Sequence, residues 1–234
     1  MIRRRQQRGK GVLDYIKRIP LALSGPRSGI PPPVRSFIQT YGNQQITDVR
    51  IGQSPVISGV QSFMNVISFG KFKKKQRNLG YDNIYHRFLI IKLANGQLFR
   101  IDKNQVVQIG SVSIDEFNKA IPLSLANANN LTVASLFDNA SRNDPKFWMY
   151  NPADKNCQIF VKDIATRNNL QPMDINSVKA LQTQNSKELV NTLGVMREVP
   201  KFITNVAGAT DRIIHGDGFR AYFQVPPQHS FHSL

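Results

Sequence analysis

The pair Asn95-Gly96 is the strongest turn signal in this sequence, and it stands between two stretches rich in aliphatic and aromatic residues. Asn and Gly accept the positive φ angles of a two-residue turn, whose twist matches that of two antiparallel strands. The stretches at residues 85–93 and 97–109 are long enough to be the two strands. The sequence therefore predicts an antiparallel hairpin around which the remaining chain must pack.

Helical periodicity appears in three other parts of the chain. Thr132 can cap a helix whose apolar positions are Val133, Leu136, Phe137 and Ala140. Asn156 can cap a second helix, which ends before Pro172 and whose apolar positions are Phe160, Val161, Ile164 and Ala165. Ser54 and Pro55 suit the start of a third helix, whose apolar positions are Val56, Val60, Phe63, Met64 and Ile67.

The remaining patterns complete a mixed fold. Residues 46–51 and 147–150 resemble strands, and short helical pieces follow Asp174. Together with the hairpin they predict an α+β fold, in which the helix that begins at Cys157 packs on a small antiparallel sheet. We expect a basic Pro-containing arm over residues 1–45, the main domain over residues 46–172, and a helical extension and tail over residues 173–234.

The charge of the chain is strongly one-sided. It contains 31 Lys and Arg against 15 Asp and Glu, which gives a formal net charge of +16. The first 35 residues hold nine of these cations, with Asp14 as the only acid, and five of them cluster at Arg3, Arg4, Arg5, Arg8 and Lys10. Such an arm attracts polyanions, so we expect nucleic acid, anionic lipid or another protein of an assembly as partner.

A second basic cluster lies between the predicted third helix and the hairpin. It contains no acidic residue, and its cations are Lys71, Lys73, Lys74, Lys75 and Arg77. The cluster is either a polyanion-binding patch or a solvated loop. Since no base-reading motif accompanies it, we expect little sequence specificity if it binds nucleic acid.

The chain has one cysteine, Cys157, which excludes an internal disulfide framework and a zinc site built from several thiolates of this chain. A lone thiol is either a buried small side chain or a reactive group. His215, His229 and His232 lie near the C-terminus, where a solvated tail is a simpler interpretation than a zinc site. We therefore predict no metal and no cofactor.

Membrane and secretion signals are weak. No stretch reaches about 18 consecutive apolar residues, so no transmembrane helix is expected. The N-terminus is too rich in arginine for the apolar core of a signal peptide, and we expect no secretion by that route. Residues 195–214 combine apolar and basic side chains, which fits either a contact with a membrane surface or packing on the main core.

Cys157 occupies the first position of its predicted helix, directly behind Asn156. At this position the unpaired backbone N–H groups and the helix dipole favour a thiolate, and a histidine alongside would favour it further. His86, near the start of the first hairpin strand, is the candidate histidine. The amides at the helix start, from Asn156, Cys157 and Gln158, are candidates for stabilising an oxyanion.

These residues carry a family resemblance. The segment Tyr85–Ile91, followed by a hairpin, a helix and the start Asn156-Cys157-Gln158, resembles the circularly permuted papain-like (NlpC-type) hydrolases. Within them it is most similar to the group of lecithin:retinol acyltransferase, phospholipid acyltransferases and viral proteins with an H-box and an Asn-Cys motif. The resemblance spans about residues 81–170. It implies a permuted papain-like fold, with His86 as general base and Cys157 as the nucleophile that forms a thioester.

In that family a second histidine or another polar residue on the adjacent strand generally orients the first histidine, and this chain has no histidine there. The turn at Asn95-Gly96 brings Arg100 and Asp102 to the matching strand, on one face. A carboxylate at Asp102 would orient the imidazolium, whereas Arg100 would disfavour it. Alternatively, the two residues form a pair on the surface of the sheet.

The sequence leaves two functions open. The first is a cysteine hydrolase or acyltransferase that acts on a lipid ester or amide through Cys157 and belongs to a virion. The second is a non-catalytic minor capsid or assembly protein, whose basic arm binds nucleic acid or other capsid proteins. Both imply a location in the virion or the host cytoplasm. The viral origin is inferred from the resemblance and the basic arm alone.

Overall fold

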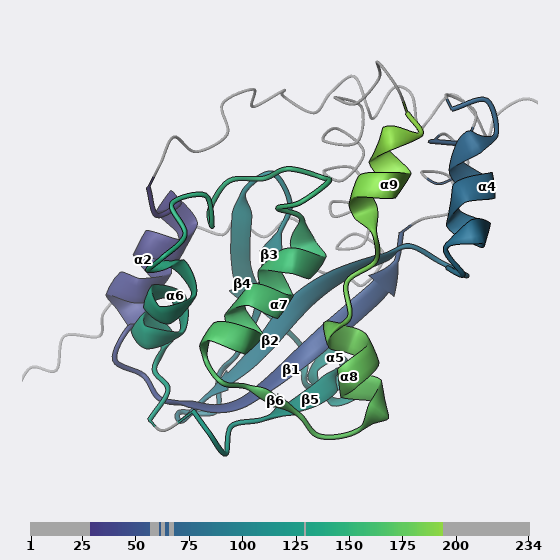
Figure 1. Cartoon of the computed structure of the whole chain (residues 1–234). Helices are drawn as coiled ribbons and strands as arrows, with labels where there is room; N and C mark the ends of the chain where they lie inside the picture. The colour runs from purple at the N-terminus through teal and green to yellow at the C-terminus, as the bar shows by residue number, and fades with distance from the viewer. Residues whose placement is uncertain (1–28, 57–60, 62–63, 66–67, 129, 194–234) are drawn as a thin grey trace, which may run out of the picture.

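The computed structural model describes residues 29–56, 61, 64–65, 68–128 and 130–193 (Figure 1). In this part of the chain a six-stranded sheet has the order β4-β3-β2-β1-β5-β6, and each neighbouring pair is antiparallel. The strands are β1 (Ile46–Pro55), β2 (Tyr85–Leu93), β3 (Leu98–Lys103), β4 (Val107–Ser111), β5 (Ile121–Ser124) and β6 (Gln171–Pro172). The described residues thus form an α+β fold, with the expected antiparallel sheet.

Helices cover both faces of the sheet. The described helices are α2 (Pro32–Tyr41), α4 (Lys71–Asn78), α5 (Ile114–Lys119), α6 (Val133–Ser141), α7 (Cys157–Arg167), α8 (Ile175–Leu181) and α9 (Ser186–Asn191). Buried side chains of α2, α6, α7 and α8 join one main core on one face, and α7 crosses the middle of that face (Figure 1). Phe117 of α5 packs on the opposite face against Phe88 and Ile90. A separate small core joins α4 and α9 through Phe72 and Leu189.

The predicted hairpin is present as β2 and β3, although its turn has three residues, 94–96, between Leu93 and Gln97 rather than two. Gly96 has a φ of 85°, and the side chain of Asn95 accepts a hydrogen bond from the N–H of Gln97 at 3.0 Å. The second predicted strand, over residues 97–109, is divided into β3 and β4. The chain turns between them where the N–H of Asn104 donates to the carbonyl of Val106.

The helices predicted behind Thr132 and Asn156 begin where the sequence indicates. The Thr132 hydroxyl accepts from the N–H of Ser135, and the Asn156 side chain accepts from the N–H groups of Gln158 and Ile159. The apolar positions predicted for α7 are all buried in the main core. The cysteine helix therefore packs on the sheet, chiefly against β2.

Two local predictions are wrong. Residues 147–150 form no strand: residues 147 and 148 end a turn that begins at residue 145, because the carbonyl and side chain of Asp144 accept the N–H groups of Phe147 and Lys146. The aromatic residues that suggested a strand fill the core from this turn, with the Phe147 ring 5.1 Å from that of Phe160. Ser54 and Pro55 end β1 instead of starting a helix, and proline is tolerated at such a strand end. Most residues of that predicted helix lie outside the described residues.

The described part of the predicted arm is folded. Residues 32–41 form α2, with Pro32 in the first turn, and this helix buries Val34 and Phe37 in the main core. The Phe37 ring lies 4.8 Å from that of Phe99 on β3. The arginines at positions 3, 4, 5 and 8 and Lys10 lie outside the described residues. At the other boundary, Ala180 of α8 also belongs to the main core, so residues beyond 172 contribute to it.

Gly52 on β1 provides a test of the packing beneath the hairpin. It pairs with Phe88, and a Cβ at this position would lie 1.9 Å from Cε2 of that ring. We expect Gly52→Ala to destabilise the protein by about 1–3 kcal/mol in urea unfolding, because the buried ring must move. Gln53→Ala, at the next and exposed position, should change stability by less than about 0.5 kcal/mol. A stabilised Gly52→Ala protein, as backbone entropy alone would give, would contradict this packing.

Candidate active site

His86, Asp102 and Cys157 meet at the N-terminal end of β2. This strand pairs with β1 from Tyr85 onward, but its pairing with β3 begins only at Phe88. Residues 85–87 therefore extend beyond β3, and the start of α7 lies against this extension. The side chain of Gln158 donates to the carbonyl of Tyr85 at 2.7 Å, which fixes the helix start to the strand.

The imidazole of His86 is held by the carboxylate of Asp102. His86 Nε2 lies 2.7 Å from Asp102 Oδ1, and the two side chains are only 5% and 3% exposed. The other carboxylate oxygen, Oδ2, accepts from Arg100 at 3.0 Å. Asp102 thus joins a histidine on β2 to an arginine on its own strand.

Arg100 is buried rather than part of a surface pair. Its second terminal nitrogen lies 3.0 Å from Glu116 Oε1, and its guanidinium carbon lies 3.5 Å from the centre of the Phe88 ring. Two carboxylates therefore balance its positive charge. Glu116 was not predicted from the sequence, although the spacing Ser113-x-x-Glu116 is a helix-capping pattern that places it on α5.

The thiol and the imidazole interact directly. Burial raises the pKa of the Cys157 thiol, but the charge and hydrogen bond of His86 and the backbone N–H of Arg87 bring this pKa below its ordinary value. Burial lowers the pKa of His86, but Asp102 and Cys157 raise it well above its ordinary value. These directions favour a thiolate–imidazolium pair in the folded protein.

The cap of α7 occupies one of the amides predicted to stabilise an oxyanion. The N–H of Gln158 donates to Asn156 Oδ1 at 3.0 Å, while the side-chain amide of Asn156 donates to Pro152 and Ser186. The N–H of Cys157 is not taken by this cap. The amide of Gln158 is therefore committed to the cap, whereas the cap leaves the amide of Cys157 for an oxyanion.

A glutamine pair connects the site to the C-terminal part of the described chain. The N–H of Gln184 donates to Gln158 Oε1 at 2.7 Å, and the Gln158 amide donates to Gln184 Oε1 at 2.8 Å. The side chain of Gln184 also donates to the carbonyl of Asn83. Gln184 was not predicted from the sequence, since a glutamine between two short helices gives no local signal.

A buried lysine lies behind the cysteine helix. Lys103 on β3 is 1% exposed, and its ammonium donates to the carbonyl of Phe147 at 2.6 Å. Burial, with a smaller contribution from Lys155, lowers the pKa of Lys103 to about 8. The sequence placed Lys103 in a strand without indicating that its side chain is buried.

The second basic cluster forms a helix rather than a loop. Lys71, Lys73, Lys74, Lys75 and Arg77 all lie on α4, whose buried positions are Phe72 and Gln76. Lys75 forms an ion pair with Glu188 on α9. The cluster is therefore divided between one cation that joins two helices and others that remain available for a partner.

Within the described residues, no three His, Cys, Asp or Glu side chains are arranged to hold a metal ion. No helix in the same part of the chain has the length and apolar character needed to cross a membrane. His215, His229, His232 and residues 195–214 lie outside it.

We compared the chain with protein-family models, with curated protein sequences and with solved structures, and none of the three comparisons gives a match. The geometry of the site and the chemistry of its residues are therefore the basis for a function.

Proposed function

We propose that this protein is a cysteine hydrolase or acyltransferase with Cys157 as nucleophile, His86 as general acid and base, and Asp102 as the residue that orients the histidine. The observation that carries the proposal is the buried chain of contacts from the Cys157 thiol through His86 to Asp102. A nucleophile, a base within hydrogen-bonding reach and a third group that orients the base are the elements of covalent acyl transfer.

The reaction would proceed in two halves. The Cys157 thiolate attacks the carbonyl carbon of an ester or amide, and the developing oxyanion accepts from the N–H of Cys157. The carbon–oxygen or carbon–nitrogen bond then breaks, the leaving group takes a proton from the His86 imidazolium, and a thioester remains. Water or another acceptor next attacks the thioester while His86 removes its proton, which releases the acyl product and restores the thiolate.

The order of the elements supports a permuted papain-like arrangement. A histidine strand, a hairpin and a later helix that begins with cysteine occur here in the order that the resemblance implies. By the same resemblance we propose a lipid ester or amide as substrate and a role as a virion-associated protein. These proposals rest on the residues at the two motifs.

The alternative is a non-catalytic minor capsid protein that binds nucleic acid or shell proteins. The formal net charge of +16 favours it, as does the low exposure of Cys157, which is 7%. The two functions are compatible in one virion protein, because the basic arm and the cysteine belong to different parts of the chain.

The pH dependence of thiol alkylation tests the catalytic proposal. Because the pKa of Cys157 is lowered, we expect iodoacetamide to label the native protein at neutral pH, where an ordinary thiol is mostly protonated. His86→Ala removes the charge and hydrogen bond that lower this pKa and leaves the burial that raises it. The labelling profile of the variant should therefore move to higher pH.

Cys157 is the one cysteine of the chain, so intact-mass measurement reports its labelling directly. Tyr85→Phe is a matched control, since it changes the neighbouring side chain and leaves the imidazole in place. Equal profiles for the wild type and His86→Ala would contradict the proposal. So would a native wild-type protein that reacts only after unfolding.

A further inference from the structure

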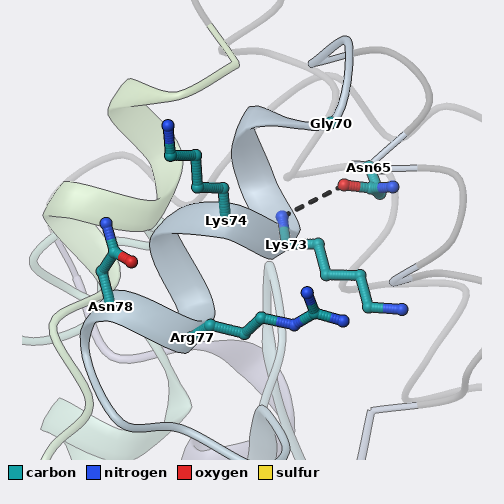
Figure 2. Close-up of a pocket in the computed structure, with 6 residues that line it drawn as sticks. All are labelled: Asn65, Gly70, Lys73, Lys74, Arg77 and Asn78. Carbon is teal, nitrogen blue, oxygen red and sulfur yellow. Dashed lines mark hydrogen bonds between the residues drawn. The ribbon is translucent and has the colours of Figure 1, made fainter.

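A hollow of about 450 Å³ lies on the exposed side of α4, away from the cysteine site. Figure 2 shows the residues that line it, which are Asn65, Gly70, Lys73, Lys74, Arg77 and Asn78. Three of the six are cations and none is acidic. The N–H of Lys73 donates to the side chain of Asn65, which ties the first turn of the helix to the opposite wall.

The three cations are available for a ligand. Lys75 on the same helix is paired with Glu188, whereas Lys73, Lys74 and Arg77 have no acidic partner among the residues that the structure describes. Grouped positive charges repel one another, and an anion between them relieves this repulsion. The hollow therefore favours an anionic ligand such as a phosphate group.

An exposed aromatic side chain adjoins the hollow. Phe69 directly precedes Gly70, and it is 91% exposed, more than any other large apolar residue that the structure describes. Its φ of 52° places a bulky residue in the left-handed region, where few such residues occur. None of the three hydrophobic clusters contains Phe69, so the ring is available to a partner.

Phosphate-binding cations beside an exposed aromatic ring are the combination that binds single-stranded nucleic acid. The backbone lies along the cations while a base stacks on the ring. A membrane surface is a poorer partner, because it requires several apolar side chains on one face and Phe69 is the one exposed large apolar side chain among the described residues from 61 to 80. We propose that this surface binds single-stranded nucleic acid, with successive backbone phosphates at Lys73, Lys74 and Arg77 and a base on Phe69.

The test is fluorescence anisotropy of the full chain with a labelled 20-nucleotide oligothymidine at several salt concentrations. Replacing Lys73, Lys74 and Arg77 by alanine should reduce the slope of log affinity against log salt by about 2, since each lost phosphate contact contributes roughly 0.7. The control variant replaces Lys119, Lys146 and Lys162, three exposed lysines elsewhere, by alanine. It loses the same formal charge and should keep the slope of the wild type.

Phe69→Ala separates stacking from charge. We expect its affinity for the oligonucleotide to fall about tenfold with an unchanged salt slope, because stacking does not release counterions. On an oligonucleotide of the same length without bases, Phe69→Ala and the wild type should bind equally. Phe69→Trp should retain the affinity of the wild type.

Three results would overturn the proposal. One is equal salt slopes for the α4 triple variant and its charge-matched control. Another is an effect of Phe69→Ala that persists on the strand without bases. The third is binding of vesicles of phosphatidylserine and phosphatidylcholine that depends on Phe69 while oligonucleotide binding does not. None of these measurements involves Cys157, so their outcome is independent of the catalytic proposal.

Discussion

Replacing Cys157 by serine is expected to abolish acyl transfer while leaving the protein folded. A serine hydroxyl stays protonated near neutral pH, and the thiolate–imidazolium pair that the site favours cannot form. Serine fits the volume of cysteine at the first position of α7, where Asn156 continues to cap the helix. Release of fatty acid from short-chain phospholipid and ester substrates measures the activity, and thermal unfolding measures the stability.

The same variant separates an enzyme from a scaffold. If Cys157 only fills the core, its serine variant buries a hydroxyl and should lose about 1–3 kcal/mol of stability. A destabilised Cys157→Ser protein, together with a wild type that neither labels nor releases fatty acid, would contradict the enzyme assignment. A fully stable variant that has lost all activity would support it.

Asp102→Asn is expected to lower the rate of acyl transfer by about a hundredfold or more. Asparagine keeps the shape of the side chain but removes the charge that raises the pKa of His86 against the effect of burial. The pKa of the imidazole therefore falls, and the imidazolium that protonates the leaving group is lost at a lower pH. The pH profile of the rate should lose its alkaline side first.

Glu116→Gln is the matched control for Asp102→Asn. It neutralises the other carboxylate that contacts Arg100 and leaves the hydrogen bond between His86 and Asp102 intact. We expect its rate to remain within a few-fold of the wild type. If both variants lost activity equally, the effect would come from the buried charge of Arg100 and not from orientation of His86.

Local chemistry accounts for what the sequence predicted well. The turn at Asn95-Gly96 and the caps Thr132 and Asn156 depend on hydrogen bonds and backbone angles within a few residues. They can therefore be predicted without knowledge of the fold. The candidate pair of His86 and Cys157 followed from the helix start and the resemblance. The structure brings these two residues into contact, and their catalytic roles remain a proposal.

The sequence could not indicate the features that depend on distant contacts. Arg100 and Asp102 are buried because Phe88 and Glu116 enclose them from two other elements. The aromatic residues at 147 and 148 fill the core from a turn, a position that β propensity does not distinguish from a strand. In α4 the lysines around Phe72 give no indication that its side chain is buried, because that burial depends on packing with α9.

The length of the chain between Leu93 and Asp102 determines which charge faces His86. With three residues, 94–96, between Leu93 and Gln97, Asp102 lies opposite Phe88 and its carboxylate accepts from the imidazole. Deletion of one residue at the start of β3, with the three-residue turn kept, would move Lys103 into the position opposite Phe88, since a one-residue slip reverses the faces of a strand. An ammonium group would then stand where the carboxylate stands now. An apparently minor change in length, at the far end of the hairpin, would thus reverse the sign of the charge beside the proposed catalytic base.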